Sequence, residues 1–212
     1  MLALSDKHGF IIAADECYAE LYPDESAPPA GLLQAAAAVG RDDFRNCMVF
    51  HSLSKRSNIP GMRSGFVAGD AGVISRFHQY RTYHGCTMPP PIQAASIVAW
   101  SDENHVRENR RRYREKFDAV LDILGPVLPV SRPEGGFFLW LRTPIGDEKF
   151  TKLLYARYNV RVLPGSFLGR EEAAGNPGAG HVRIALVAAL DECVRAARHI
   201  RDLIQGLPKM QE

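Results

Sequence analysis

The sequence lacks any apolar run long enough to cross a bilayer, and its N-terminus, MLALSDKHGF, lacks the charged start and long apolar core of a secretion signal. Cysteine is scarce, and the four that occur are far apart: Cys17, Cys47, Cys86 and Cys193. Without a C-x-x-C pair, neither a disulfide framework nor a zinc site is indicated. The seven histidines also lack metal-binding spacings. We expect reduced thiols, a cytoplasmic protein, no metal site and no membrane partner.

An excess of charge of one sign is also absent, because the formal net charge is only +2 over 212 residues. The single dense basic run, RENRRRYREKF (residues 107–117), is interleaved with glutamate at helical spacing. This pattern favours a solvated helix face over a polyanion-binding surface. We therefore expect no nucleic-acid partner.

The first half of the chain has the pattern of an α/β domain. Short apolar runs that end near polar residues predict buried strands: FIIAAD (10–15), CMVFHSLS (47–54) and GFVAGD (65–70). Helices are predicted before Gly9, over residues 31–40, and over the proline-led segment 89–100. A mainly parallel sheet with helices is the expected architecture.

The second half changes character. Apolar positions from Glu103 to Leu124 fit a period near 3.6, which predicts a long amphipathic helix ended by Gly125 and Pro126. After it we expect a helix over residues 147–158, a final helix from Leu190 onward, and four strands: VLPVS (127–131), GGFFLWLR (135–142), VRVLP (160–164) and HVRIALV (181–187). The predicted domains are residues 1–102 and a smaller α+β domain over 103–212.

Polar residues that suit one kind of chemistry follow the strands of the first half. Ser52 and Ser54 come at the end of a predicted strand, Lys55 follows at once, and Arg63 lies eight residues on. Hydroxyls, loop amides and an arginine fork hold phosphate dianions, whereas a lysine amine becomes a nucleophile when its pKa falls. Asp15 ends another strand, and Tyr18 follows it. An amine, a phosphate cup, an acid and a phenol together indicate pyridoxal 5'-phosphate.

Four segments resemble the fold-type I pyridoxal-phosphate aminotransferases of class I/II: AADECYAELY, HSLSKRSNIPGMRSGFVAGD, VLPGSFLG and HVRIALV. They occur in the family's order, and the resemblance extends over the whole chain. Within the family the likeness is greatest to the succinyldiaminopimelate aminotransferases of bacterial lysine biosynthesis, on SKRSNIPGMRSGFVAGD, YRTYHG, AWSDENHVRENR and NPGAGHVRIALVAAL. The resemblance implies transamination from glutamate to a keto acid, here N-succinyl-2-amino-6-ketopimelate, by a homodimeric enzyme.

The resemblance also implies a role for each site residue. Lys55 would bind the cofactor covalently and then move the substrate proton. Asp15 would pair with the pyridine nitrogen, and Tyr18 would hydrogen-bond the ring 3-oxygen. The phosphate would be held by Ser52, Ser54 and Arg63. Arg183 in HVRIALV would bind the substrate α-carboxylate, although without the family pattern a surface arginine on a strand edge is an equal interpretation.

Other residues have two interpretations. Arg56 and Asn58 could meet the distal carboxylates of a dicarboxylic substrate, or could form a structural turn before Pro60. The resemblance further places glycines near the substrate mouth and two residues near a neighbouring subunit: Gly135, Gly136 and Gly165, and Tyr83 and His84.

Family members are roughly twice this long, and they carry further site elements before the position of Met1. These are an N-terminal arm, a phosphate-binding glycine loop, an aromatic residue that stacks on the ring, and an N-P-T-G segment. We expect the chain to be the C-terminal part of such an enzyme, with an unpaired sheet edge and uncertain activity alone. The alternatives are another fold-type I pyridoxal-phosphate enzyme, either an aspartate- or aromatic-type aminotransferase or a β-lyase, and a non-catalytic partner of a full-length homologue.

Overall fold

The computed structural model describes residues 1–85 and 87–207, so Cys86 lies outside the described residues. The chain forms two compact units, the first ending at Arg110 and the second beginning at Arg111. Helix α6 (Asn104–Leu124) contains residues of both. The predicted domains, a cofactor-binding domain over residues 1–102 and a small domain over 103–212, are defined by function and stay a prediction.

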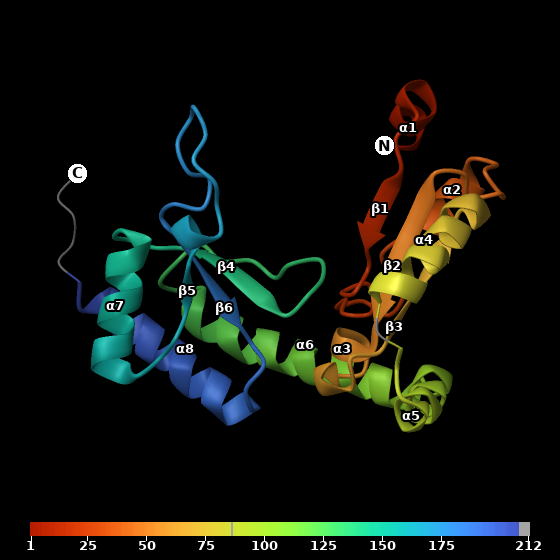
Figure 1. The fold of residues 1–212 in the computed structure, drawn as a ribbon. Coiled ribbons are helices and arrows are strands. Elements are labelled where there is room, and N and C mark those ends of the chain that lie inside the picture. The colour runs from red at the N-terminus through yellow and green to blue at the C-terminus, as the bar shows by residue number, and fades with distance from the viewer. Residues whose placement is uncertain (86, 208–212) are drawn as a thin grey trace. The chain divides into compact units, whose positions relative to one another are not determined.

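The first unit is built on a sheet with the strand order β1 (Ile12–Asp15), β2 (Cys47–Ser52), β3 (Gly65–Gly69) (Figure 1). β1 and β2 are parallel, with α2 (Leu32–Ala38) in the long connection between them. β3 departs from the parallel order and runs antiparallel to β2. A Cβ at Gly65 would lie 2.3 Å from the carbonyl oxygen of His51, so glycine is what lets β3 approach β2 here.

The remaining helices of this unit are α1 (Leu2–His8), α3 (Leu53–Arg56), η1 (Pro60–Met62), α4 (Ala71–His84) and α5 (Pro90–Ser101). As predicted, Gly9 ends α1 in the left-handed conformation, with φ of 71°. Helix α4 was not among the predicted elements. Its signal is the N-cap Asp70, whose side chain accepts a hydrogen bond of 3.0 Å from the backbone N–H of Val73.

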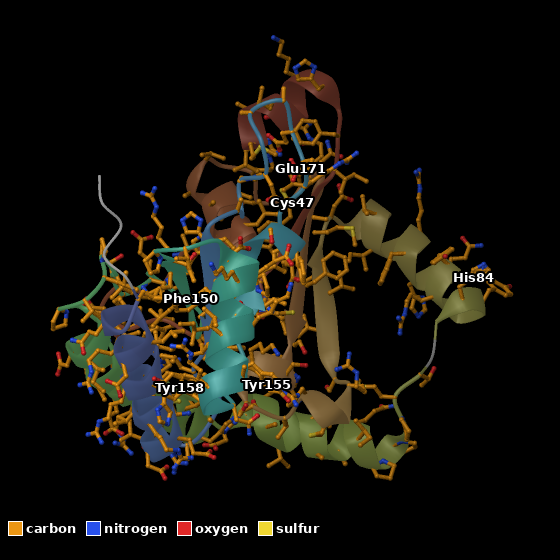
Figure 2. All side chains as sticks on the ribbon, turned by 90° about the vertical axis from the view of Figure 1, so that its left-hand side faces the viewer. Cys47, His84, Phe150, Tyr155, Tyr158 and Glu171 are labelled. Atoms are coloured by element: carbon orange, nitrogen blue, oxygen red, sulfur yellow. The ribbon has the colours of Figure 1, made fainter. Side chains whose placement is uncertain are left out.

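The second unit packs two helices and the end of α6 around a small antiparallel sheet. The strand order is β4 (Phe138–Arg142), β6 (His181–Ala185), β5 (Leu163–Pro164), and the helices are α7 (Asp147–Tyr158) and α8 (Leu190–Gln205), with the short η2 (Gly165–Phe167). Figure 2 shows Phe150 and Tyr158 on the side of α7 that faces α8, and Tyr155 on the other side. Phe150 is fully buried in the core, and Tyr158 stacks on His199 of α8.

Two predicted strands of this unit are wrong in whole or in part. Residues 127–131 form no strand, because Pro126 and Pro129 withdraw backbone donors; Leu128 and Val130 still pack on the core. Of residues 160–164, only Leu163–Pro164 pair with β6, and the proline ends the ladder. Among the described residues, no helix is both long and apolar enough to cross a membrane.

Candidate functional site

The two residues at the centre of the candidate site follow neighbouring parallel strands. Asp15 is the last residue of β1 and stands opposite Phe50, two residues before the end of β2. Lys55 lies one turn further on, in α3, which begins directly after β2. Because parallel strands bring their carboxyl ends to one edge of the sheet, the carboxylate of Asp15 and the α3 turn share that edge. This is where open α/β sheets bind their ligands.

Hydroxyl groups gather where β2 passes into α3. Ser52 caps α3, and its Oγ accepts a hydrogen bond of 3.0 Å from the backbone N–H of Ser54. The same Oγ lies 2.8 Å from Oγ of Ser54 and 3.1 Å from the carbonyl oxygen of Ser64. The predicted pair of serines is therefore brought together at a helix N-cap. One turn of helix is too short to bind an anion by its dipole, so the hydroxyls would carry that role.

Arg63 directly precedes this cluster on the returning chain. Its backbone is left-handed, with φ of 52° and ψ of 39°, a conformation that a non-glycine residue seldom adopts. Such strained positions concentrate at functional sites. The side chain is exposed, and its guanidinium donates a hydrogen bond of 2.9 Å to the carbonyl oxygen of Pro60. Arg63 thus carries its positive charge next to Ser64, whose carbonyl oxygen contacts Ser52.

The carboxyl group of Asp15 is held in its ionised form. The thiol and the backbone N–H of Cys17 donate to it and lower its pKa, and the backbone hydrogen bond measures 3.0 Å. Burial and the neighbouring Asp15 raise the pKa of the Cys17 thiol to about 11, while the charge of Lys55 acts in the opposite direction. Cys17 therefore contacts the acid and is close enough to the amine for the charge of Lys55 to act on it. Sequence reasoning missed it, although its place two residues after Asp15 was the available signal.

Of the two remaining predicted residues, one lies on the turn beside Asp15 and the other lies in the second unit. Tyr18 is on the turn that follows β1, and its side chain is partly exposed. Arg183 is in the second unit on β6, the middle strand of its sheet, so the interpretation of an edge-strand arginine is wrong. Its guanidinium lies 4.6 Å from the centroid of the Phe138 ring.

The structure favours the structural role for Arg56 and Asn58. Arg56 is only 4% exposed, and it donates a hydrogen bond of 2.9 Å to the carbonyl oxygen of Ala99 and pairs with Glu103. A guanidinium committed in this way does not face a substrate. Asn58 adopts a left-handed backbone with φ of 55°, as a turn before Pro60 requires.

The donor set of this edge fits pyridoxal phosphate. An ionised carboxylate suits a protonated ring nitrogen, an amine on an adjoining turn suits an aldehyde, and paired hydroxyls beside an arginine suit a phosphate. In the described part of the chain, no group of three histidine, cysteine or acidic side chains could hold a metal ion.

The family model described as aminotransferase class I and II matches residues 1–200. The chain belongs to this family. Its members depend on pyridoxal phosphate, which agrees with the cofactor predicted from the residues.

Several known proteins are similar to this family member. An aminotransferase of Neisseria meningitidis is 53% identical, with a TM-score of 0.90 over 95% of this chain and 51% of that chain. The LL-diaminopimelate aminotransferase of Maridesulfovibrio salexigens is 31% identical over 96% of this chain and 50% of that protein. A probable N-succinyldiaminopimelate aminotransferase of Thermus thermophilus is 27% identical, with a TM-score of 0.77 over 95% of this chain and 52% of that chain.

These likenesses confirm the predicted fold class over the part that is matched. The chain spans about half the length of the curated relatives it matches.

Proposed function

We propose that this chain carries the lysine-bearing part of a pyridoxal-phosphate site in an aminotransferase that moves an amino group from glutamate to a keto acid. The observation that supports it most is the placement of Asp15 and the Lys55 turn after neighbouring parallel strands, with the Ser52 and Ser54 hydroxyls between them. When bound, pyridoxal phosphate supplies a ring that withdraws electrons from the carbon that bears the amino group.

The residues would divide the remaining work. Asp15, ionised at neutral pH, would keep a proton on the ring nitrogen, and Tyr18 would donate to the ring 3-oxygen. Ser52, Ser54 and Arg63 would bind the phosphate and fix the orientation of the ring. Lys55 Nζ, as a neutral amine, would take the proton from the substrate Cα and return it at the cofactor carbon that carried the aldehyde, on the other side of the amino nitrogen.

Arg183 would orient the substrate. A guanidinium fork binds a carboxylate through two parallel hydrogen bonds, which would hold the Cα–H bond in a fixed direction. The Phe138 ring under its guanidinium restricts the side chain before substrate arrives. The contact between Arg183 and the substrate carboxylate would therefore raise both the affinity for substrate and the rate of proton transfer.

For the acceptor we propose N-succinyl-2-amino-6-ketopimelate, in the formation of diaminopimelate for lysine. The names of two similar proteins, from Maridesulfovibrio salexigens and Thermus thermophilus, both contain diaminopimelate. A cytoplasmic homodimer is the proposed form of the whole enzyme, as is usual in this family.

The first experiment tests the lysine. Pyridoxal phosphate is added to the purified chain, or to a longer protein that supplies what precedes these residues in the relatives, and the absorbance of the imine is recorded. Lys55→Ala should abolish this absorbance. Lys152→Ala is the matched control, because Lys152 is exposed on α7 and pairs with Glu148. An unchanged spectrum after Lys55→Ala would exclude Lys55 as the anchor.

The second experiment tests the reaction and its acceptor. Glutamate and a panel of keto acids, with and without a succinylated amine, are incubated with the loaded protein, and the amino-acid products are identified. Amination of the succinylated keto acid in preference to the others supports the proposed acceptor. Amination of other keto acids alone would reject that acceptor but keep the transaminase assignment.

A further inference from the structure

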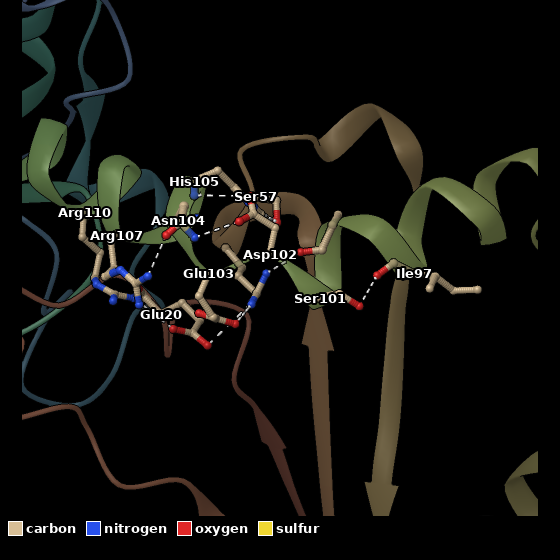
Figure 3. A network of polar contacts seen from close by, with 12 residues as sticks. Glu20, Ser57, Ile97, Ser101, Asp102, Glu103, Asn104, His105, Arg107 and Arg110 are labelled. Carbon is tan, nitrogen blue, oxygen red and sulfur yellow. Dashed lines mark hydrogen bonds and ion pairs between the residues drawn. The ribbon is translucent and has the colours of Figure 1, made fainter.

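A group of buried charges lies next to the candidate site, and the proposed chemistry does not use it. Two arginines that are each about 5% exposed, Arg56 and Arg110, approach the same carboxylate, that of Glu20. Figure 3 shows Glu20, Glu103 and Arg110 within this network, beside a second set of contacts around Asp102 and His105. Buried arginines without a substrate to bind need another reason.

The Arg56 end of this network is fixed to the lysine helix. Arg56 is the residue after Lys55 and the last of α3. Its guanidinium is held by the carbonyl oxygen of Ala99, by Glu103 and by the Trp100 ring, whose centroid is 5.0 Å away. The held guanidinium therefore tethers the backbone next to Lys55.

Helix α6 holds the same turn from its C-terminal side. The side-chain amide of Asn109 donates to the carbonyl oxygens of Lys55 and Arg56, at 3.3 and 3.5 Å. Nε2 of His105 lies 2.8 Å from Oγ of Ser57, and Nδ1 lies 2.6 Å from Oδ2 of Asp102. The Asn109 contacts satisfy carbonyl groups that the end of a helix leaves without intrahelical partners, and the His105 contact fixes the Ser57 side chain that follows.

The Glu20 end is fixed to the acid. The turn from Asp15 to Leu21 is closed by its own hydrogen bonds: the backbone N–H of Ala19 donates to the carbonyl of Glu16 at 3.0 Å, and that of Leu21 donates to the carbonyl of Tyr18 at 2.9 Å. Leu21 is 3% exposed and anchors the turn in the core. These hydrogen bonds therefore connect Glu20 to the same turn that carries Asp15 and Tyr18.

Arg110 and Arg56 hold Glu20 from two sides. Nη1 of Arg110 donates to Oε2 of Glu20 at 3.1 Å, while Arg110 itself is held by Glu25 through hydrogen bonds of 2.6 to 3.1 Å and by the Tyr22 ring. Nε of Arg56 lies 3.7 Å from Oε1 of Glu20, the distance of an ion pair rather than of a hydrogen bond.

We infer that Glu20, held between Arg56 and Arg110, is a positioning residue that sets the spacing between the Asp15–Tyr18 turn and Lys55. The acid and phenol of one turn and the amine of the other are thereby held in register by charges that have no part in the proposed chemistry. This inference rests on the proposed function for its purpose, but its geometry concerns this chain alone.

The test compares Glu20→Gln with Asp6→Asn. Asp6 is the matched control because its carboxylate is also shared by two arginines, the buried Arg41 and the exposed Arg45, and it lies in α1 rather than beside α3. The first measurement is hydrogen exchange of the Ser57 amide, whose bond to the carbonyl of Leu53 closes α3, in the cofactor-free protein. Glu20→Gln should speed this exchange about tenfold, as the loss of a charged hydrogen bond would.

The second measurement is the pH midpoint at which the imine absorbance of the loaded protein changes. Glu20→Gln should shift this midpoint, because the distance from Asp15 to the lysine changes, whereas Asp6→Asn should leave it in place. If Glu20→Gln does not fold, Arg110→Lys, which keeps the charge but loses the fork, should give the same shifts with smaller size.

Equal exchange and equal midpoints in the Glu20 and Asp6 variants would overturn the inference, even if both proteins melt at a lower temperature. Failure of the unsubstituted protein to form any imine would instead overturn the proposed function. In that case the exchange of the Ser57 amide alone decides whether Glu20 positions α3.

Discussion

The two units of the chain are stabilised by different means. The second unit, from Arg111 onward, has one continuous apolar core in which Phe150, Leu139 and Leu203 are fully or almost fully buried. The first unit has fewer than half as many buried apolar side chains among the described residues, and it buries charged and hydroxyl groups in their place: Ser5, Arg41, Arg56, Ser64, Ser96 and Arg110. The candidate cofactor residues of the N-terminal side belong to this first, more polar unit, where each of them is half-buried or exposed.

The difference shows where the first unit depends on specific contacts. Apolar burial is non-directional and tolerates small shifts, whereas a buried guanidinium is stable only with its partners in place. Helix α5 illustrates the same point, because it is apolar on all sides yet only Ser96 is buried in it, and Ile97 and Val98 are exposed. The first unit therefore depends on directional contacts between specific side chains, and apolar burial contributes less to its stability than it does in the second unit.

The largest effect is expected in the apolar core. Phe150→Ala should lower the free energy of unfolding of the second unit by about 3–5 kcal/mol, because it removes a fully buried ring and leaves a cavity. Urea denaturation, followed by the fluorescence of Trp140 in a Trp100→Phe background, measures it. Tyr155→Ala on the same helix is the control; this ring is 48% exposed, and its loss should cost less than about 1 kcal/mol.

Fluorescence of Trp100 in a Trp140→Phe background then reports on the first unit. If Phe150→Ala shifts this transition as much as the transition of Trp140, the two units unfold together and their contrast has no thermodynamic meaning. Separate transitions would establish that each unit has its own stability.

A smaller effect is expected from the buried charges. Arg110→Met should destabilise the first unit by about 2 kcal/mol, since it removes the guanidinium that pairs with both Glu20 and Glu25. The value is below that of a fully buried pair because both carboxylates keep access to solvent, with exposed fractions of 32% and 41%. The matched change Arg132→Met removes the exposed pair with Asp118 and should cost about 0–1 kcal/mol. Equal losses in the two variants would show that burial adds nothing to the Arg110 network.

The described part of the second unit also has one buried charged residue, Asp147. Replacing it by asparagine should lower the free energy of unfolding by about 1 kcal/mol. Its carboxylate accepts hydrogen bonds from the backbone N–H groups of Ser166 and Gly180, at 2.9 and 3.2 Å. Burial acts to raise the pKa of Asp147, but these hydrogen bonds outweigh it and hold the pKa below its ordinary value. Because the folded-state pKa is lowered, the stabilisation is present above the unfolded pKa and is lost as the pH falls through the folded one.

Asp147→Asn should therefore differ from the unsubstituted protein at pH 7, and the difference should begin to shrink below about pH 4 and disappear below the lowered pKa of the folded state. Thermal unfolding at a series of pH values measures both. A stability difference that persists unchanged in acid would assign the effect to packing of the loop and not to the charge.

The sequence predicted the positions of the strands in the first unit well, because apolar runs that stop at Asp15 or Ser52 indicate strands without reference to neighbours. Their predicted burial was right only for β2; the residues of β1 and β3 are half-buried or exposed. It failed where the decisive contact is distant in sequence. Residues 127–131 are apolar enough for a strand, but their prolines deny them a partner. Helix α4 has no buried residue and thus gave no apolar pattern to detect.

The roles of individual charges were the least predictable. In the basic run 107–117, the pattern predicts a solvated face, and the exposed Arg107 and Arg111 agree with it, yet Arg110 is buried against Glu20 and Glu25 from ninety and eighty-five residues away. Arg56 equally could not be separated from a substrate-binding arginine, because its partners Ala99 and Glu103 come from another part of the chain. Local pattern identifies the residue type, and only the fold identifies the partner.

The smallest effect concerns no stability at all, but the chemistry of two cysteines in the two units. With a pKa of about 11, Cys17 should be alkylated at pH 8 about two orders of magnitude more slowly than an ordinary thiol, and its rate should rise with pH up to that value. Cys193 in the second unit is 6% exposed, so its alkylation should instead follow unfolding. Peptide mapping by mass spectrometry separates the two sites.

Substitutions nearby turn this measurement into a test of the candidate site. Asp15 raises the pKa of Cys17 and Lys55 lowers it, so Asp15→Asn should speed alkylation of Cys17 while Lys55→Ala should slow it further. The control Arg142→Ala, in the second unit, should leave the alkylation rate of Cys17 unchanged. If Cys17 reacts at the rate of an ordinary thiol and ignores both substitutions, the acid, the thiol and the amine are not neighbours in solution, and the first unit does not hold the geometry on which a pyridoxal-phosphate site depends.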